Sequence, residues 1–307
     1  MTNTLAANIL ALRQIIKQPY KQTLFNMNDV ISNKEMTRRQ KCFGGKWDLF
    51  SNEGNLGTSE SLWVSRKENM IRYLACDCTS TMDVSASLLK QNRFPQWSWI
   101  LSEAQNQGRG QLGRSWISMP GNLFATIRLP QNAGTLGNLL PLALGVVLVE
   151  VMAELGLPAE IKWPNDILVG RTKVGGILVE ERYGKSLAGI GINVHKGPEA
   201  DFFSQSFKII PGSFQTFGVK ISVPHLWMRI ELFLKHRLAA FISHPGHVVE
   251  RLGKCLAFKN EPIIVTHAGP WNGPATLVDI SATGGLIIRT ARGDQMIDRG
   301  QISPQVF

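Results

Sequence analysis

The sequence predicts an α+β protein with a large mixed α/β domain followed by a small all-β module. Between residues 70 and 242, apolar strand-like segments alternate with segments of helical spacing. After residue 255 the pattern changes to short strands separated by glycine-containing turns, which is typical of a compact β module. The chain has 307 residues, of which 44% are hydrophobic and 18% charged, so it has the length and composition of a globular protein with two domains.

We expect the larger domain to contain these elements in order: strand 71–76, helix 83–90, strands 97–103 and 122–129, helix 138–155, strands 161–169, 173–180 and 187–194, and helix 224–242. The Gly-Arg-Thr turn at 170–172 joins two of these strands in a predicted β-hairpin. The apolar run at 138–155 predicts a buried helix, because it is too short to cross a bilayer and contains Pro141 and Glu150. The C-terminal module is expected to have strands at 262–267, 275–281 and 286–290.

The domain limits follow these changes in pattern. We assign residues 1–69 to an N-terminal extension without a defined role, 70–255 to the larger domain and 256–307 to the β module. The extension begins with an amphipathic helix pattern at 5–16, which lacks the features of a signal peptide. No two compact helices joined by a short turn are visible in 1–69, so we expect no helix-turn-helix and no sequence-specific nucleic-acid binding. Because every candidate functional residue lies beyond residue 69, we expect the extension to be dispensable for chemistry.

Net charge indicates the kind of ligand that the protein binds, and the cysteine content indicates its redox compartment. The net charge of +10 favours anionic ligands, whereas residues 256–307 carry four basic and four acidic residues and are neutral. The four cysteines form no CxxC pair and no metal-ligand spacing. Reduced thiols in a cytoplasmic protein are therefore expected.

A glycine-rich basic segment, Gly108-Arg109-Gly110-Gln111-Leu112-Gly113-Arg114-Ser115-Trp116, is the first candidate site. Glycines let the backbone approach a ligand closely, and arginine guanidinium groups form bidentate hydrogen bonds with carboxylate or phosphate oxygens. The segment is compatible with an anion-binding loop or with a mobile basic surface loop.

Polar residues within apolar strands form the second candidate site. Such residues must face solvent, pair with one another or meet a ligand. Pro164 within the first hairpin strand also indicates an edge or a bulge, where sheets often open towards a site. The residues concerned are Lys162, Asn165, Asp166, Lys173 and Asn193. Ser80 and Thr81 precede the helix at 83–90, where their hydroxyls can cap the helix or face a ligand.

Four motifs, GRGQLGRSW, KWPNDILV, KVGGILVE and GIGINV, occur in this order and at the spacing that resembles the biotin protein ligase family. The resemblance covers residues 70 to 305 and implies a mixed-sheet catalytic domain with an SH3-like C-terminal barrel. It also implies a two-step reaction in which biotin and ATP form biotinyl-5′-AMP and pyrophosphate, after which a lysine of a biotin carboxyl carrier domain takes the biotinyl group. Biotin, ATP and Mg²⁺ are the implied small molecules, no membrane is involved, and a homodimer is allowed.

The resemblance also implies roles for individual residues. Lys173, Arg109 and Arg114 would place positive charge between the biotin carboxylate and the α-phosphate, and Asp166 would accept the proton of the carrier lysine. Residues that match biotin-binding positions are Ser80, Thr81, Gln105, Gly108, Arg109, Lys173 and Gly176, and residues that match the nucleotide side are Arg114, Trp116, Lys162, Asn165 and Asn193. Asn165 and Asp166 also match the Mg²⁺ region.

Two positions differ from the family pattern. Gln111 replaces a commonly found arginine, so less loop charge is available to retain the adenylate, and Met82 replaces an asparagine. Two other functions stay open: a lipoate or octanoate ligase or transferase of the same superfamily, and a biotin-sensing transcriptional regulator. The motifs KWPND and GRGxxGRxW favour biotin over a fatty acyl chain, because the ureido ring of biotin needs polar partners.

Overall fold

The computed structural model describes residues 33–50, 56, 58, 62–198, 209–269 and 271–305. From Asn33 onward these residues form one compact unit. The amphipathic helix predicted at 5–16 lies outside the described residues, as does most of the segment in which a helix-turn-helix was sought. No helix of the described ranges combines the length and the apolar character needed to cross a bilayer.

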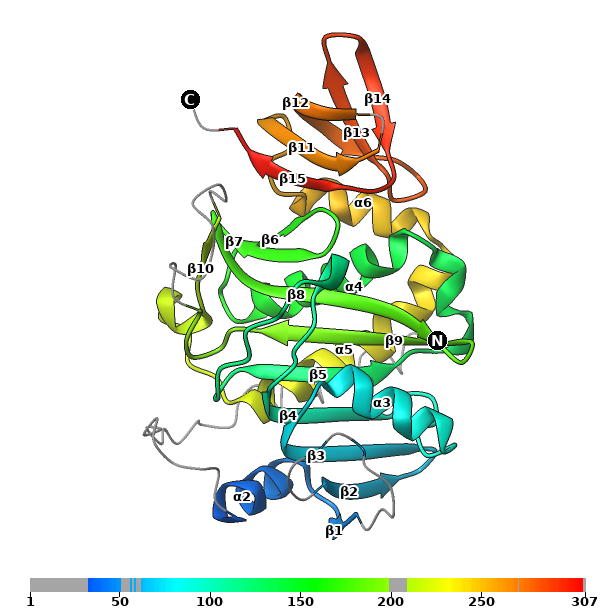
Figure 1. Ribbon diagram of the computed structural model, residues 1–307, viewed down its shortest axis with the longest axis vertical. Coiled ribbons are helices and arrows are strands. Elements are labelled where there is room, and N and C mark those ends of the chain that lie inside the picture. The colour runs from blue at the N-terminus through cyan, green and yellow to red at the C-terminus, as the bar shows by residue number, and fades with distance from the viewer. Residues whose placement is uncertain are drawn as a thin grey trace, which may run out of the picture. The chain divides into compact units, whose positions relative to one another are not determined.

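A ten-stranded sheet is the main layer of the unit (Figure 1). Nine strands follow one another across it in the order β1 (Asp48–Leu49), β2 (Leu62–Lys67), β3 (Met70–Cys78), β4 (Trp99–Gln105), β5 (Leu123–Arg128), β9 (Lys185–Ile192), β8 (Thr172–Arg182), β7 (Asp166–Val169) and β6 (Ala159–Lys162). The short β10 (Ile210–Pro211) pairs with β8. Neighbours are antiparallel except β3 with β4 and β8 with β10, so the sheet is mixed as expected.

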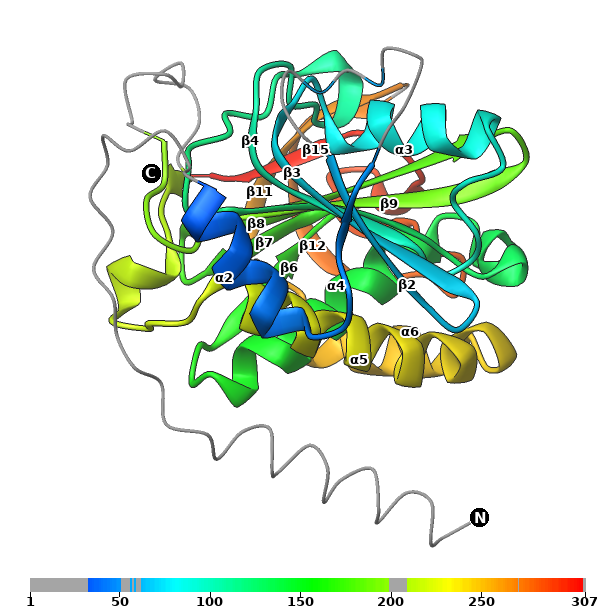
Figure 2. The ribbon, with the colours of Figure 1, turned by 90° about the horizontal axis from the view of Figure 1, so that it is seen from below.

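Helices cover both faces of this sheet (Figure 2). One face carries α3 (Thr81–Lys90), whose Val84 and Leu88 are fully buried in a smaller core. The other face carries α2 (Asn33–Phe43), α4 (Leu139–Glu154), α5 (Val223–Ser243) and α6 (Gly246–Cys255). The helix predicted at 138–155 is α4, whose buried residues contribute to the main core.

The N-terminal boundary predicted at residue 70 differs from the structure. Residue 70 begins β3, which pairs with β2 along the whole of a hairpin from Leu62↔Ala75 to Lys67↔Met70. In α2, the Arg39 guanidinium forms a buried ion pair with Glu103 of β4. The ring of Phe43 lies 5.0 Å from that of Trp99 between centroids. The described residues between 33 and 69 therefore contribute strands and core side chains to the same unit as the larger domain, and the loop-like composition around residue 55 concealed this.

The C-terminal module is a five-stranded antiparallel sheet with the order β14 (Gly293–Ile297), β13 (Leu286–Thr290), β12 (Trp271–Ile280), β11 (Pro262–Ala268) and β15 (Gln301–Pro304). In the described residues no pairing joins β14 to β15, so the SH3-like barrel expected from the sequence is not seen as a closed barrel. The turn before β13 packs on the larger sheet, where the indole Nε1 of Trp163 donates to the Gly284 carbonyl at 3.0 Å. Gly284 needs to lack a side chain, because a Cβ there would lie 2.9 Å from the Asn138 backbone.

Candidate active site

A cavity of about 400 Å³ lies over β5, β8 and β9, between the start of α3 and the glycine-rich loop. It brings together twelve of the thirteen residues predicted from the sequence: Ser80, Thr81, Gln105, Arg109, Arg114, Trp116, Lys162, Asn165, Asp166, Lys173, Gly176 and Asn193. Residues that were not predicted also line it, among them Ile117, Phe124, Ile177 and Gln301. The predicted residues come from six segments of the chain, so their convergence is a property of the fold.

Gly108 is the one predicted residue outside the lining. A Cβ at this position would lie 2.5 Å from the Trp116 carbonyl oxygen and 2.7 Å from Ser118 Oγ. The Gly108 carbonyl accepts from the Trp116 amide at 2.8 Å, which closes the base of the loop. Gly108 therefore shapes the loop, because only a glycine allows this close approach.

The loop itself is a tight hairpin with a turn at its tip. The Gly110 amide donates to the Arg114 carbonyl at 2.8 Å, and η1 (Gln111–Gly113) forms the turn. Leu112 and Gly113 have left-handed φ values of 56° and 72°, and the Leu112 side chain is 70% exposed. The loop thus follows an ordered path over the cavity, with Gln111 among the lining residues.

Trp116 anchors the loop to the sheet. Its ring lies against Gly191 of β9 and Gly176 of β8, where added Cβ atoms would come within 2.7 Å and 3.1 Å of ring carbons. Its indole Nε1 is buried without a hydrogen-bond partner in the protein. The two glycines therefore create a flat seat for an aromatic ring.

A lysine pair held by one carboxylate lies at one end of the cavity, where the resemblance places the reaction, and this end is called the reacting end below. Lys162 Nζ lies 2.7 Å from one oxygen of Asp166, and Lys173 Nζ lies 2.5 Å from the other. The hairpin register explains this arrangement, because Lys162 is paired directly with Asp166 across β6 and β7. The Lys173 ammonium also lies 5.4 Å from the centre of the Trp116 ring.

The pKa of Asp166 results from two opposing effects. Burial raises it, but the charges of Lys162 and Lys173 and their hydrogen bonds outweigh burial and hold the pKa well below its usual range. A carboxylate with such a low pKa is a weak base. In this structure Asp166 orients the two lysines, and its role as proton acceptor for the carrier lysine stays a prediction.

The predicted Mg²⁺ region does not form a cation site. Both oxygens of Asp166 are engaged by lysine ammonium groups, and the Asn165 amide donates to the Ile177 carbonyl at 2.6 Å. Among the described residues no group of three or more His, Cys, Asp or Glu side chains could hold a metal ion. Asn165 and Asp166 therefore do not fit a protein-bound Mg²⁺, and no step below uses one.

The opposite end of the cavity is a chain of hydrogen bonds. Thr126 Oγ1 lies 2.9 Å from Thr81 Oγ1, which donates to Gln105 Oε1 at 3.1 Å, and Gln105 Nε2 donates to Ser118 Oγ at 3.0 Å. The backbone amide of Thr81 also donates to Gln105 Oε1, at 2.8 Å. Ser80 caps α3 by accepting from the Met82 amide at 3.3 Å, so its capping and ligand-facing roles are compatible. Thr126 is fully buried and was not predicted.

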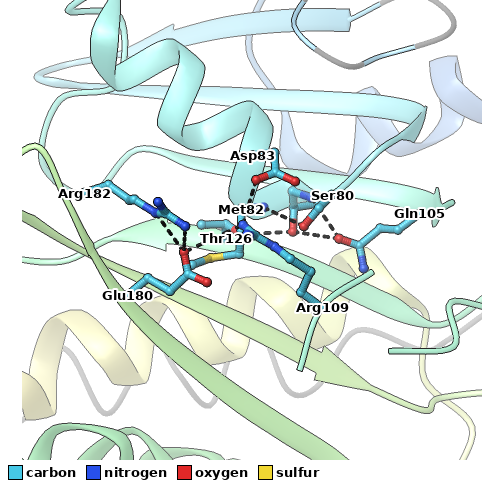
Figure 3. A network of polar contacts seen from close by, with 9 residues as sticks. Ser80, Met82, Asp83, Gln105, Arg109, Thr126, Glu180 and Arg182 are labelled. Carbon is cyan, nitrogen blue, oxygen red and sulfur yellow. Dashed lines mark hydrogen bonds and ion pairs between the residues drawn. The ribbon is translucent and has the colours of Figure 1, made fainter. Parts of the chain in front are cut away.

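Arg109 lies at this end of the cavity, where its side chain reaches Asp83 near Ser80 and Thr126 (Figure 3). Its Nη2 is 2.7 Å from Asp83 Oδ1 and 3.7 Å from Glu180 Oε2. Glu180 is seven residues beyond Lys173 on β8, a distance of about 23 Å at roughly 3.3 Å per residue. The expectation that Arg109 supplies charge at the reacting end therefore differs from the structure, in which two carboxylates neutralise it.

Arg114 and Asn193 complete the reacting end. The Arg114 Nη2 donates to Gln301 Oε1 of β15 at 2.6 Å, so the C-terminal module contributes a side chain to the cavity. Asn193 donates to the Gly212 carbonyl at 2.9 Å, while its amide oxygen is buried without a hydrogen-bond partner in the protein. No local sequence signal indicates Gln301, because its role depends on the docking of a separate sheet.

Comparison with known proteins agrees with this geometry. Residues 73–196 match the model of the biotin/lipoate A/B protein ligase family. The chain is 31% identical over 205 residues to the bifunctional ligase/repressor BirA of Bacillus subtilis, over 64% of this chain and 63% of that protein. It is 27% identical to a biotin–acetyl-CoA-carboxylase ligase of Paracoccus denitrificans, of which it covers 89%.

A solved structure of similar fold carries ligands. The biotin protein ligase of Aquifex aeolicus in complex with biotin and ATP superposes with a TM-score of 0.67 and 25% identity, over 78% of this chain and 100% of that chain. Together with the four ordered motifs and the cavity that they line, these matches show that residues 73–196, which carry most of the site, are similar to the biotin/lipoate A/B protein ligase family.

Proposed function

We propose that the protein is an ATP-dependent biotin protein ligase. A biotin carboxylate oxygen bonds to the α-phosphorus of ATP and pyrophosphate leaves, which gives biotinyl-5′-AMP. The amine of a carrier-domain lysine then bonds to the carboxyl carbon, AMP leaves and the nitrogen loses a proton. The observation that carries the proposal is a single cavity with a hydroxyl and amide end at Thr81 and Gln105 and a lysine end at Lys162 and Lys173.

The hydroxyl and amide end suits the ureido ring of biotin. A ureido group has a carbonyl acceptor and two N–H donors, so it requires both kinds of partner. Ser80, Thr81 and Gln105 offer hydroxyl and amide groups of both kinds, and Gly176 lies between this end and Lys173 on the cavity wall. In the empty cavity these groups are partnered within the protein, and their remaining hydrogen-bonding capacity can be used by a ureido ring but not by a lipoyl or octanoyl chain. This favours biotin over the acyl substrates of the same superfamily.

The lysine end suits the approach of two anions. A carboxylate and a phosphate oxygen about 4 Å apart repel by about 4 kcal/mol at an effective dielectric constant of about 20. We assign Lys173 to the position between them, because it is preorganised by Asp166 and faces the Trp116 ring. Lys162 and Arg114 would meet the phosphates. Trp116, Asn165 and Asn193 would contact the nucleotide, with the unpartnered Trp116 and Asn193 groups as donor and acceptor.

The relatives support the same reaction. The Aquifex structure contains both biotin and ATP, and the Paracoccus relative is named for a carboxylase substrate. Because the chain spans only 63% of the Bacillus relative, its substrates and partners remain proposals. We propose a biotin carboxyl carrier domain as the protein substrate and a cytoplasmic location for the enzyme. We also propose that the C-terminal module is equivalent to the SH3-like module of the family. A homodimer is compatible with the proposal and is measured by sedimentation.

A regulatory role in transcription is the second candidate, because the Bacillus relative is named a ligase and repressor. We propose no sequence-specific DNA binding for this chain. A gel-shift assay with candidate operator DNA tests this, and a specific shift that depends on biotin would contradict the proposal.

Mass spectrometry of a carrier domain tests the ligase function. The carrier is incubated with the protein, ATP and Mg²⁺, and with either biotin or lipoate. We expect one biotinyl group on a single lysine and ATP-dependent release of pyrophosphate. Modification with lipoate alone, or with octanoate in place of biotin, would show that the substrate assignment is wrong.

A further inference from the structure

Arg109 joins the glycine-rich loop to two separate elements of the catalytic unit. Its Nη2 pairs with Asp83 in the first turn of α3 at 2.7 Å and lies 3.7 Å from Glu180 on β8. Glu180 is held in turn by Arg182, whose Nε and Nη2 lie 2.9 Å and 2.7 Å from its Oε2. Figure 3 shows the Arg109 side chain reaching between α3 and β8.

The charges of this cluster balance. Asp83 and Glu180 contribute two negative charges and Arg109 and Arg182 two positive ones. The side chain of Arg109 is 33% exposed, that of Asp83 44% and that of Glu180 21%, so these are partly exposed ion pairs that water and salt screen in part. With its charge compensated in this way, Arg109 is suited to holding the loop rather than to neutralising a phosphate.

Arg109 is one of three anchors of the loop. Trp116 fixes the end of the loop on Gly191 and Gly176, and Arg114 is fixed by Gln301. Arg109 fixes the beginning of the loop, next to the hydroxyl and amide end of the cavity. If this anchor is released, the two strands of the loop hairpin remain joined at Gly110 and Arg114, but the hairpin is free to tilt away from α3.

We propose that Asp83 and Glu180 are positioning residues that hold Arg109. Through Arg109 they keep the glycine-rich loop closed over the hydroxyl and amide end of the cavity. Their effect is to slow the release of the bound ligand. The identity of that ligand rests on the proposed biotin ligase function, whereas the closure of the loop does not.

Asp83→Asn and Glu180→Gln test the proposal. Both changes remove a charge and keep the shape of the side chain. Glu181→Gln is the matched control, because Glu181 is the next residue on β8, is exposed and carries the same charge. Circular dichroism and thermal melting check that all variants fold.

The first measurement needs no ligand. Amide hydrogen exchange across residues 108–116 should be about fivefold faster in Asp83→Asn than in the wild type, as expected for loss of a partly exposed ion pair. Asp83→Glu should restore most of the protection, and Glu181→Gln should not change it. High salt should bring the wild type towards the Asp83→Asn rate.

The second measurement is the dissociation rate of biotin by stopped flow. It should rise about fivefold in Asp83→Asn and in Arg109→Gln, and no further in the double variant, because both changes release the same anchor. In Asp83→Asn the single-turnover rate at saturating biotin and ATP should stay within about twofold of the wild type, because Asp83 does not line the cavity. A general structural defect would lower the single-turnover rate as well as speed the dissociation of biotin.

Unchanged exchange of residues 108–116 and an unchanged dissociation rate in Asp83→Asn would overturn the proposal, as would additive effects in the double variant. If the wild type binds no biotin, the proposed function is wrong, and the hydrogen-exchange result still decides whether the anchor exists.

Discussion

Replacing Lys173 with alanine should slow adenylation much more than it weakens biotin binding. The ammonium group lies 2.5 Å from Asp166 and 5.4 Å from the centre of the Trp116 ring, so it is held in place before ligands bind. A unit charge about 4 Å from a developing anion contributes about 4 kcal/mol at an effective dielectric constant of about 20. The side chain is 32% exposed, and screening reduces this to about 3 kcal/mol. The expected loss is on the order of 100-fold in rate.

Single-turnover formation of biotinyl-5′-AMP measures this effect, with biotin affinity from calorimetry and folding from circular dichroism. Lys173→Arg should recover only part of the rate, because a planar guanidinium cannot replace a compact ammonium between two anions. Lys185→Ala is the control: Lys185 begins β9, donates to Gln131 at 2.8 Å and does not line the cavity. Its rate should equal that of the wild type.

A near wild-type rate in Lys173→Ala would refute the reasoning. The charge would then have to come from Lys162 or Arg114, the other cations at this end of the cavity. An equal loss of rate and biotin affinity would also refute it, because it would mean that Lys173 contributes uniform binding rather than stabilisation of the transition state.

Three further changes give separate tests. Gly191→Ala places a Cβ 2.7 Å from two carbons of Trp116, so the ring must move; we expect about tenfold weaker nucleotide binding, measured by calorimetry. Asp166 has a lowered pKa, so its contribution to stability is present above its unfolded value of about 3.9 and is lost as the pH falls towards its folded value. Urea unfolding of Asp166→Asn should therefore vary less with pH below about 4 than that of the wild type. A chain shortened to begin at residue 33 should keep adenylation, whereas one that begins at residue 70 should lose folding by circular dichroism, because it lacks β2 and the α2 partner of β4.

The local sequence was sufficient for part of the reacting end of the site. Lys162 lies directly opposite Asp166 in the β6–β7 hairpin, so alternation along these strands predicts that contact. Lys173 lies opposite Leu168, on the face of Asp166, because the pairing of β7 with β8 shifts between Ile167 and Leu168, and regular alternation does not give this shift. The fold class does follow from the local sequence, since the strands at β3, β4, β5, β8 and β9 were all predicted from apolar runs.

Contacts between distant segments could not be derived in this way. Thr126 joins Thr81 across 45 positions, and Gln301 reaches Arg114 across 187. The N-terminal boundary was misplaced for the same reason, because the Arg39–Glu103 ion pair connects α2 to a strand 64 positions away. Hydrophobic periodicity reports which face of an element is buried, but not which element buries it.

The two arginines of the glycine-rich loop show how contacts between distant segments change the proposed mechanism. Arg109 and Arg114 have the same side chain in the same loop, and composition alone makes both suitable for an anion. In the structure Arg109 meets Asp83 and Glu180, whereas Arg114 meets the neutral amide of Gln301. A guanidinium paired with carboxylates has its charge compensated, so Arg109 is suited to fixing the loop. Arg114 lines the cavity and contacts the C-terminal module through Gln301, and it is the loop arginine that we propose acts with the lysine pair.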